Sequence, residues 1–157
     1  MIIVSLTGHS NSGKTSLAKE LTRLLSREGI PVTYIKNIPH DDASFDAEGK
    51  DTENLLSAGA VVSAGRSPSK TFFTFNGSMQ ISEIIMMIRE RSRICILEGF
   101  RNELDQLSPQ IRVIMDLGSA EVIFHEEGGK PKKQSFLLWS QFGDLVNQVS
   151  ETLHKML

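Results

Sequence analysis

Residues 8–15 read GHSNSGKT and fit the phosphate-binding pattern G-x-x-x-x-G-K-[ST]. Glycines in such a loop let successive backbone N–H groups turn toward an anion. Lys14 would place a positive charge between the β- and γ-phosphates, and the Thr15 hydroxyl would ligate Mg²⁺. The pattern therefore predicts a loop that holds the phosphates of a nucleoside triphosphate.

The segments around this loop have the order that the motif requires. A β-branched run at residues 2–6 precedes it and is predicted to be a buried strand. Apolar residues at helical spacing, from Leu17 to Leu25, follow it, and Gly29 ends that predicted helix. Residues 31–36 read as a second strand. A strand, a helix and a strand with short connections predict a βαβ unit and a parallel sheet.

A phosphate loop of this kind also needs an acid at the end of a neighbouring strand, to orient Mg²⁺. The run ICILEGF provides Glu98 after four apolar residues, and Glu98 is therefore the predicted magnesium carboxylate. Asp116, which ends a predicted strand at residues 111–116, is the alternative. Asn102 and Asp105 have the spacing of a guanine-binding motif but lack its lysine, so the residues leave the purine undecided.

A polar segment follows the second strand and should lie beside the phosphates, because parallel strands end at one edge of a sheet. Lys36 and Lys50 would neutralise phosphate charge or remain solvated. Asp51 would flank the site or cap a short helix predicted at residues 52–58. His40, Asp41 and Asp46 could contribute to a metal site, although their spacing is typical of no particular metal.

The rest of the chain is predicted to complete a single α/β domain over residues 1–157. Residues 61–75 read as two strands around a Ser-Pro turn, and residues 81–92 as a helix in which Met86 and Met87 fill the core. Residues 121–125 are a further predicted strand, and residues 127–133 a loop. From Phe136 onward, an amphipathic helix is expected to close the fold against the sheet.

Composition excludes several classes of function. The net charge of −2 gives no overall basic field for nucleic acid or a membrane surface. No apolar run approaches the roughly 18 residues that span a bilayer, and the start of the chain reads as a strand rather than a signal peptide. The single cysteine, Cys95, lies in an apolar run and is expected to be a buried hydrophobic residue in a reducing cytoplasm.

Taken in order, five elements of the sequence resemble the MobB family of molybdopterin-guanine dinucleotide biosynthesis proteins. They are the NSGKT loop, the lysine-led segment with His and Asp, GKDT, AGA, and the apolar strand ending in EGF. The resemblance covers residues 2–101. It implies a small P-loop protein that binds GTP and Mg²⁺, hydrolyses GTP weakly and forms a homodimer. It also implies a partner, a MobA-like molybdopterin guanylyltransferase, and molybdopterin as the molecule to which GMP is attached.

Together with the residue patterns above, the resemblance implies the site residues. Those implied to bind nucleotide are Gly8, Ser10, Asn11, Ser12, Gly13, Lys14, Thr15, Ser16, Lys36, His40 and Asp51. Thr15, Glu98 and Asp46 are assigned to the metal, with Lys14, Thr15 and Glu98 as the catalytic set. Residues 61–75 fall where the family builds its dimer contact. The run KNIPH replaces a histidine-rich KHxHH, which leaves an imidazole-dependent role for this segment without two of its three histidines.

Three functional hypotheses follow. The first is a slow GTPase that assists molybdenum-cofactor biosynthesis, with Arg66 or Arg101 as a candidate arginine finger across a dimer. The second is a small-molecule kinase that uses Asp41, Asp42 or Asp46 as base. The third is an adapter that binds nucleotide without hydrolysing it. Acceptor-dependent phosphate transfer, acceptor-independent hydrolysis and tight binding without turnover distinguish the three.

Overall fold

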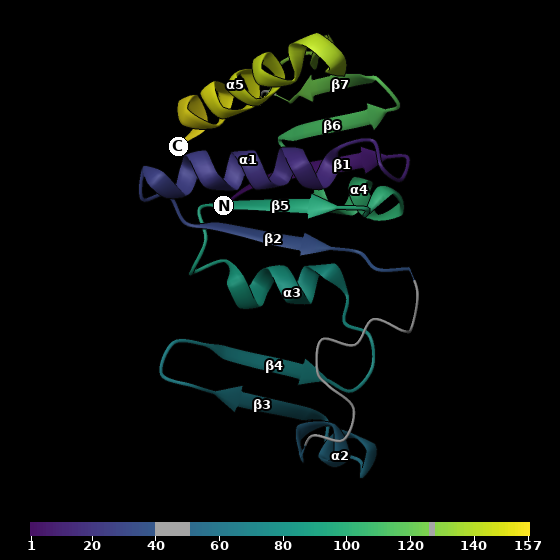
Figure 1. Cartoon of the computed structure of the whole chain (residues 1–157), viewed down its shortest axis with the longest axis vertical. Coiled ribbons are helices and arrows are strands. Elements are labelled where there is room, and N and C mark those ends of the chain that lie inside the picture. Colours follow the sequence, from purple (N-terminus) through teal and green to yellow (C-terminus); the bar gives the residue numbers. More distant parts are fainter. Residues whose placement is uncertain (40–50, 126–127) are drawn as a thin grey trace. The chain divides into compact units, whose positions relative to one another are not determined.

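The computed structural model describes residues 1–39, 51–125 and 128–157. His40, Asp41, Asp42, Asp46 and Lys50, all named above as candidates, lie outside the described residues. The chain divides into two compact units (Figure 1). One comprises Met1–Ile38 with Met87–Leu157, and the other Pro39–Met86. Each unit is described by itself, and a single domain over the whole chain stays a prediction.

The first unit is a mixed α/β fold around a six-stranded sheet. Its elements are β1 (Ile2–Gly8), α1 (Lys14–Arg27), β2 (Val32–Lys36), β5 (Ile94–Glu98), η1 (Arg101–Glu103), α4 (Leu104–Leu107), β6 (Ile111–Asp116), β7 (Ser119–Phe124), β8 (Lys132–Leu137) and α5 (Leu138–Met156). The strand order is β2-β5-β1-β6-β7-β8. The pairs β2–β5, β5–β1 and β1–β6 are parallel, and β6–β7 and β7–β8 are antiparallel. The predicted α/β class with a mostly parallel sheet is confirmed.

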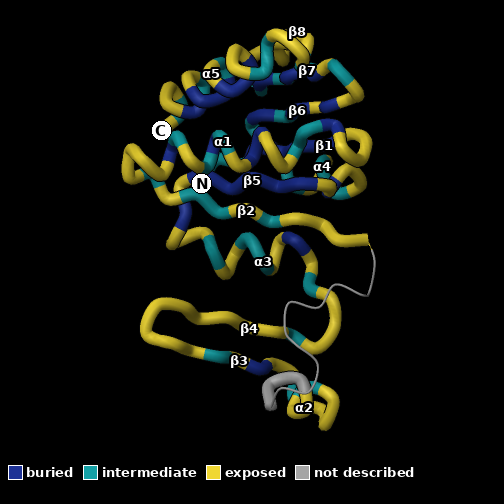
Figure 2. Tube along the Cα trace, viewed as in Figure 1, coloured by how far each residue is buried: buried dark blue, intermediate teal, exposed yellow. Residues whose placement is uncertain are grey.

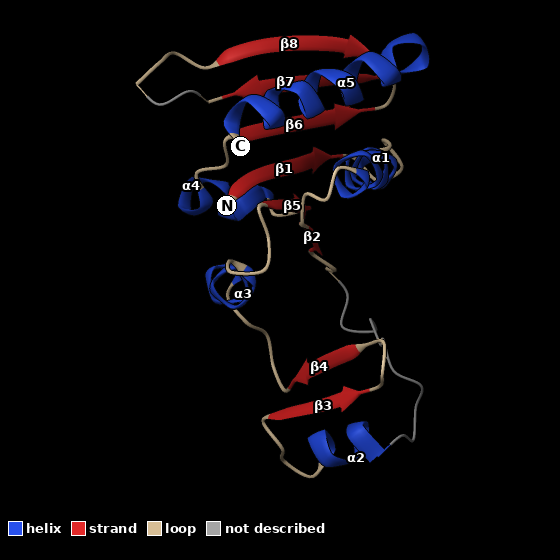
Figure 3. Ribbon diagram, turned by 90° about the vertical axis from the view of Figure 1, so that its left-hand side faces the viewer, coloured by secondary structure: helices blue, strands red, loops and turns tan. Residues whose placement is uncertain are grey.

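The core of this unit lies between the sheet and two helices. Figure 3 shows α1 and α5 on one face of the sheet, and the two helices contact each other. Leu17, Leu21 and Leu25 of α1 are fully buried, as their helical spacing predicts. Leu145 and Leu153 of α5 are fully buried in the same cluster. This packing fixes α1, and with it the loop that precedes α1, against the strands.

Strand β5 is buried along its whole length (Figure 2). It lies between β1 and β2, so both of its edges are hydrogen-bonded. An apolar run without polar alternation is typical of such a central parallel strand. Cys95 is fully buried, which confirms its predicted role, and burial raises the pKa of its thiol to about 12. The acid that ends β5 is therefore held by a rigid element.

The second unit contains α2 (Asp51–Ser57), an antiparallel hairpin of β3 (Val62–Arg66) and β4 (Thr71–Phe75), and most of α3 (Ile81–Ile88). The predicted hairpin around a turn is confirmed. Gly65 pairs with Phe72, and a Cβ at Gly65 would lie 2.0 Å from Phe72 Cζ. The Phe72 ring thus covers the glycine, a cross-strand arrangement that pins the register of a hairpin.

Three predictions of detail are wrong. Residues 127–133 were expected to form a loop, but Lys132 and Lys133 begin strand β8. Phe136, expected in the last helix, lies in β8 as its one buried residue. Met86 and Met87 are 64% and 52% exposed rather than buried in a core, because they lie off the isoleucine face of α3. In the described residues, no helix is long and apolar enough to cross a bilayer.

Candidate functional site

The loop between β1 and α1 has a backbone that requires glycine at its ends. Gly8 has φ +129° and Gly13 has φ +93°, both in the left-handed region. A Cβ on Gly8 would lie 1.7 Å from the Met115 carbonyl oxygen on the neighbouring strand β6. Between the two glycines, Asn11 also has a positive φ, +59°. The pattern of small residues therefore reflects both backbone conformation and close contact with β6.

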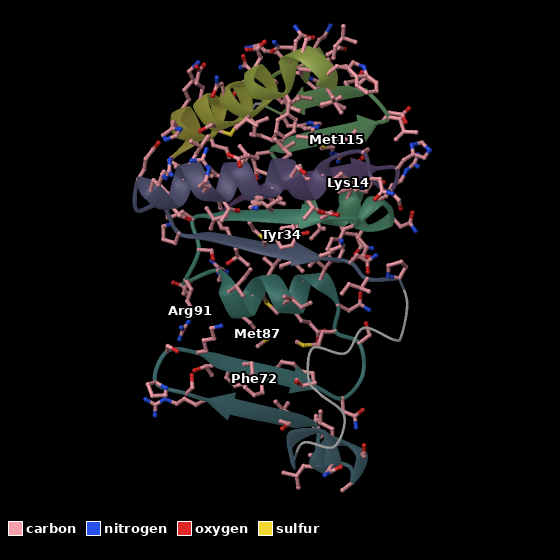
Figure 4. The ribbon with its side chains drawn as sticks, in the orientation of Figure 1. Lys14, Tyr34, Phe72, Met87, Arg91 and Met115 are labelled. Atoms are coloured by element: carbon pink, nitrogen blue, oxygen red, sulfur yellow. The ribbon has the colours of Figure 1, made fainter. Side chains whose placement is uncertain are left out.

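Helix α1 begins directly after this loop, with Gly13 as its N-cap and no side-chain cap. The N-terminus of a helix carries a partial positive charge and unpaired N–H groups. Both favour an anion at this place. Figure 4 labels Lys14 at this end of α1, beside the carboxyl ends of the parallel strands. The predicted phosphate site thus has the geometry that phosphate binding needs.

The Lys14 side chain folds back onto its own loop. Its Nζ donates to the carbonyl oxygens of Gly8, at 3.2 Å, and of His9. The Ser12 hydroxyl lies 3.4 Å from the same nitrogen and itself donates to the His9 carbonyl at 2.8 Å. These contacts hold the Lys14 ammonium against the loop itself.

On the β5 side of the loop, three polar side chains surround one buried acid, Glu98; we call Thr15, Tyr34, Lys36 and Glu98 the β5 flank. Glu98 is 5% exposed. The Thr15 hydroxyl donates to its carboxylate, with distances of 3.0 and 3.2 Å to the two oxygens. The Tyr34 hydroxyl donates to Oε2 at 2.8 Å, and Lys36 Nζ lies 3.6 Å from Oε1. Glu98, predicted from the sequence, is thus brought to Thr15.

Parallel register explains this gathering. Glu98 pairs with Leu6 of β1 and with Lys36 of β2, so the ends of three strands meet at one level. Tyr34 lies two residues before Lys36 and shares its face of β2. Burial, then the hydrogen bond to Glu98, raise the pKa of Tyr34 to about 12. The phenol therefore keeps its proton and remains a donor at neutral pH.

A magnesium ion fits the β5 flank. Mg²⁺ takes oxygen ligands, commonly one or two from the protein, with phosphate oxygens and water completing the set. The Thr15 hydroxyl and the buried Glu98 carboxylate supply such oxygens side by side. Within residues 1–39, 51–125 and 128–157, no group of three His, Cys, Asp or Glu residues could hold an ion by itself. A metal here would therefore depend on the phosphates of a ligand.

Asp116, the alternative acid, does not face Thr15. It lies on the other side of the loop, where its Oδ1 is 3.0 Å from His9 Nδ1 and accepts from the Leu117 backbone N–H at 2.7 Å. Both His9 and Asp116 are largely exposed. The structure thus separates the two candidate acids and places Glu98 alone of the two beside the Thr15 hydroxyl.

Next to Asp116 begins an apolar surface, which we call the β6 flank: Leu117, Gly118, Leu138, Trp139 and Phe142. With residues of the loop it lines a pocket of about 460 Å³. The sequence predicted a helix that includes Leu138 and Phe142 but no functional role for any residue of this flank, because the flank lies beyond the segment that carries the resemblance. The available signal in the sequence was Trp139, the single tryptophan of the chain, whose side chain is 84% exposed in the structure.

Four other residues predicted to take part in the site lie on four different elements of the fold. Ser16 lies exposed in the first turn of α1 and lines the pocket. Asp51 is the first residue of α2, and its side chain is outside the description. Arg66 ends β3 in the second unit, and Arg101 begins η1 in the first. An arginine finger from either residue stays a prediction.

Comparisons with known proteins agree on one family. The family model of molybdopterin guanine dinucleotide synthesis protein B, MobB, matches residues 3–128. A putative molybdopterin-guanine dinucleotide biosynthesis adapter protein of Methanocaldococcus jannaschii is 28% identical over 125 residues, covering 78% of this chain and 51% of that protein. A probable adapter protein of the same name from Bacillus subtilis is 29% identical over 101 residues, covering 63% and 58%. The chain thus spans little more than half the length of these relatives.

Solved structures support the fold. The crystal structure of Bacillus subtilis MobB aligns with a TM-score of 0.57 at 22% identity, covering 74% of this chain and 80% of that one. The structure of a MobB homologue from Bacillus stearothermophilus aligns with a TM-score of 0.54 at 18% identity, covering 74% and 64%. At these identities the likeness concerns the arrangement of strands and helices.

Proposed function

The chain belongs to the MobB family, and from that membership we propose that it binds GTP with Mg²⁺ and acts as an adapter in molybdopterin guanine dinucleotide biosynthesis. The two curated relatives are named as adapter proteins of this biosynthesis. In this proposal the loop at residues 8–15 holds the phosphates, and the chain hydrolyses GTP slowly. Its working partner is a MobA-like guanylyltransferase, and molybdopterin is the molecule that receives the nucleotide.

The contact between Thr15 and Glu98 carries the nucleotide part of the proposal. A hydroxyl at the start of α1 and a buried carboxylate at the end of β5 come from residues 83 positions apart. A solvated strand-end glutamate would have no reason to be 5% exposed and to accept from both Thr15 and Tyr34. A buried carboxylate is costly unless it is paired, so its placement at the loop supports a functional role.

Electrostatics would do most of the chemistry. Lys14 and the backbone N–H groups of the loop would stabilise charge that builds on the γ-phosphate during hydrolysis. Bound Mg²⁺ would neutralise part of the charge on the β- and γ-phosphate oxygens. Thr15 and Glu98 would hold that ion, while Lys36 balances the charge of Glu98. We expect slow turnover, which suits a protein whose task is to carry rather than to consume nucleotide.

The second unit supports the proposal of a homodimer. Its described surface exposes a run of apolar side chains on the hairpin and next to it: Val61 (74%), Val62 (41%), Phe72 (48%) and Phe73 (60%). An isolated two-stranded hairpin is marginally stable in water, and exposed apolar patches mark interaction surfaces. We propose that a second copy of the chain covers this patch. A cytoplasmic location is part of the same proposal.

No observation favours the kinase hypothesis, because its candidate bases, Asp41, Asp42 and Asp46, lie outside the described residues. The adapter without hydrolysis remains the second candidate, favoured by the names of the two relatives. Turnover separates it from the slow GTPase. Phosphate release from GTP in the absence of any acceptor, at a rate above that of a Lys14→Ala variant, would assign the chain to the GTPase class.

Equilibrium binding of GTP and ATP, each with and without Mg²⁺, tests the proposal first. We expect a preference for GTP of about tenfold, or roughly 1.4 kcal/mol. Lys14→Ala should weaken binding by about tenfold to a hundredfold, the usual effect of losing a hydrogen-bonded charge. Lys19→Ala is the matched control, because Lys19 is an exposed lysine of the same helix outside the site. Equal affinity for the two nucleotides would contradict the guanine preference, and equal loss in both variants would contradict the site.

A further inference from the structure

A pocket of about 460 Å³ opens beside the phosphate loop, on the side away from Glu98. One wall is made by the loop and the first turn of α1, through Asn11, Ser12, Gly13 and Ser16. The opposite wall is the apolar β6 flank. Among the described residues, the lining contains hydroxyl and amide groups but no charged side chain. Its volume lies within the usual range for small-ligand sites, roughly 300–1,000 Å³.

The most exposed ring of this pocket, that of Trp139, packs against the backbone of Gly118. Trp139 is 84% accessible, yet a Cβ on Gly118 would lie 2.5 Å from its Cζ2 atom. The indole therefore rests directly on the backbone of Gly118, which has φ +91°. The Leu138 N–H donates to the Gly118 carbonyl at 2.9 Å and ties the turn between β6 and β7 to the start of α5. A large flat ring is thus both ordered and open to a ligand.

Two residues of the pocket lining are anchored to the hydrophobic core. Phe142 and Leu138 are partly buried and pack against the main hydrophobic cluster of the first unit. Together with Trp139 they offer apolar surface on one turn of α5. Such a surface suits a flat heteroaromatic ring better than a sugar or a free anion, because stacking and apolar contact are its main resources.

The loop and the pocket share residues, so one ligand could contact both. Ser12 and Gly13 belong to the phosphate loop and to the lining of the pocket, and Ser16 follows Thr15 directly. A ligand with phosphates on the loop can therefore extend into the pocket without leaving the protein surface. Thr15 faces the opposite side, toward Glu98. The two flanks thus divide one elongated ligand between them.

We propose that this pocket takes the purine base of the nucleotide, with the ring stacked on Trp139. The inference rests on the proposed function, because it assumes that the loop holds nucleotide phosphates. Stacking and shape distinguish the two fused rings of a purine from the single ring of a pyrimidine. They do not distinguish guanine from adenine, so Trp139 contributes equally to both.

The chain offers a direct test, because Trp139 is its only tryptophan. Its fluorescence reports on the pocket and on nothing else in the protein. Titration with GTP and with ATP should quench this fluorescence. Inorganic tripolyphosphate should bind the loop, as measured by calorimetry, and leave the fluorescence almost unchanged. UTP should bind more weakly than either purine nucleotide.

Variants make the test quantitative. Trp139→Ala should weaken GTP and ATP by the same factor, about tenfold, and leave tripolyphosphate unaffected. Trp139→Phe should retain most of the affinity, because it keeps a stacking ring. Leu137→Ala is the matched control, since Leu137 is an exposed apolar residue two positions away that does not line the pocket. Circular dichroism melting of each variant checks the fold.

The outcomes separate this inference from the proposal on which it rests. If GTP binds in a Lys14-dependent manner, but Trp139 fluorescence does not respond and Trp139→Ala binds GTP normally, the base lies elsewhere and the inference is wrong. If neither GTP nor tripolyphosphate binds, the proposed function fails and the inference fails with it. Quenching by tripolyphosphate as strong as by GTP would also overturn it, because the signal would then not come from the base.

Discussion

On the β5 flank of the phosphate loop the polar groups are paired with one another, whereas on the β6 flank the ring of Trp139 is open to solvent. Glu98 is 5% exposed and accepts from Thr15 and Tyr34, while Trp139 is 84% exposed and lines an open pocket. Both flanks border the same short loop. The difference indicates that one side of the loop holds a buried, paired charge, whereas the other side presents an exposed aromatic ring.

Topology explains why the flanks differ. β5 lies between two parallel neighbours, so its last residue is surrounded by the ends of β1 and β2. On the other side, the sheet turns antiparallel after β6, and the connection to β7 is a tight turn through Leu117 and Gly118. A parallel edge gathers side chains from several strands. The tight turn, hydrogen-bonded to the start of α5, presents a small exposed surface instead.

Each flank also contains a residue type that occurs only once in the chain. Tyr34 is the only tyrosine and Trp139 the only tryptophan. The ultraviolet titration of the phenol and the fluorescence of the indole therefore report on the two flanks separately, without labels. The predictions below use this pair of signals to test whether the flanks are independent.

Gly8→Ala should have the largest effect, because Gly8 supports both flanks. The new Cβ would lie 1.7 Å from the Met115 carbonyl oxygen, so the loop and β6 must separate. We expect nucleotide affinity to fall at least about a hundredfold, which corresponds to a loss of roughly 2.7 kcal/mol of binding free energy. Isothermal calorimetry with GTP measures this, and both optical signals should change.

Gly29→Ala is the control for this variant. Gly29 also has a positive φ, +75°, but an added Cβ there meets nothing within 4 Å. It should cost only the backbone strain, about 1–2 kcal/mol of unfolding free energy, and leave GTP affinity intact. If the two variants bound GTP equally well, close contact with β6 would not be what holds the loop.

Glu98→Gln should have an intermediate effect, confined to the β5 flank. It keeps the shape of the side chain but removes the charge, so the gain in GTP affinity on adding Mg²⁺ should shrink about tenfold. Quenching of Trp139 by GTP should persist. Loss of that quenching at saturating GTP would show that the flanks are coupled.

The same variant should alter the titration of Tyr34. Burial, the hydrogen bond to Glu98 and the charge of Glu98 together raise the pKa of the phenol to about 12. In Glu98→Gln the burial stays, so the pKa should fall only part of the way toward the unperturbed value of about 10. Because the folded pKa is raised, the phenol proton stabilises the fold below about pH 10, and this stability is lost as the pH rises toward 12. An unchanged titration curve would contradict the role of Glu98.

His154→Gln should have the smallest effect and should leave both flanks unchanged. His154 Nε2 pairs with Glu28 and its Nδ1 with the Ser150 carbonyl, which links α5 to the end of α1. The bond to Glu28 and then the bond to Ser150 raise the pKa of His154. The pair stabilises the fold fully below about pH 6.5, and that stability is lost as the pH rises through the raised pKa.

The partners in this pair are partly exposed, so solvent screening limits its contribution to about 1 kcal/mol or less. Thermal melting should therefore show a difference of roughly 2–4 °C between wild type and variant at about pH 6, and almost none at about pH 9. A difference of equal size at both pH values would indicate that packing rather than charge is responsible. GTP affinity should not change at either pH.

The loop at residues 8–15 and the acid beside it, Glu98, could be located from the sequence because their signals are local. The loop needs glycines and a lysine at fixed spacing, and an acid after an apolar run marks the end of a buried strand. Tyr34 was missed because its contact with Glu98 joins residues 64 positions apart and depends on strand register. The alternation Tyr34-x-Lys36 at a strand end, which places both side chains on one face, was the available clue.

The errors have physical causes as well. Strand β8 was missed because, in the antiparallel edge position, it exposes almost all of its residues and keeps only Phe136 buried. Its sequence, KKQSFL, therefore lacks the apolar alternation of a half-buried strand. Met86 and Met87 were misplaced for the opposite reason: their hydrophobicity suggested a core, but the four isoleucines of α3 already supply its apolar face.

The inward fold of Lys14 has a consequence for how a ligand comes and goes. Its ammonium already has acceptors in the Gly8 and His9 carbonyls and in the Ser12 hydroxyl, so an arriving phosphate must compete with the loop itself for this cation. The net gain on binding is correspondingly smaller than the bare attraction between the two charges. After the proposed nucleotide departs, the lysine would return to these partners. Such a loop would favour rapid exchange of the proposed ligand over long retention.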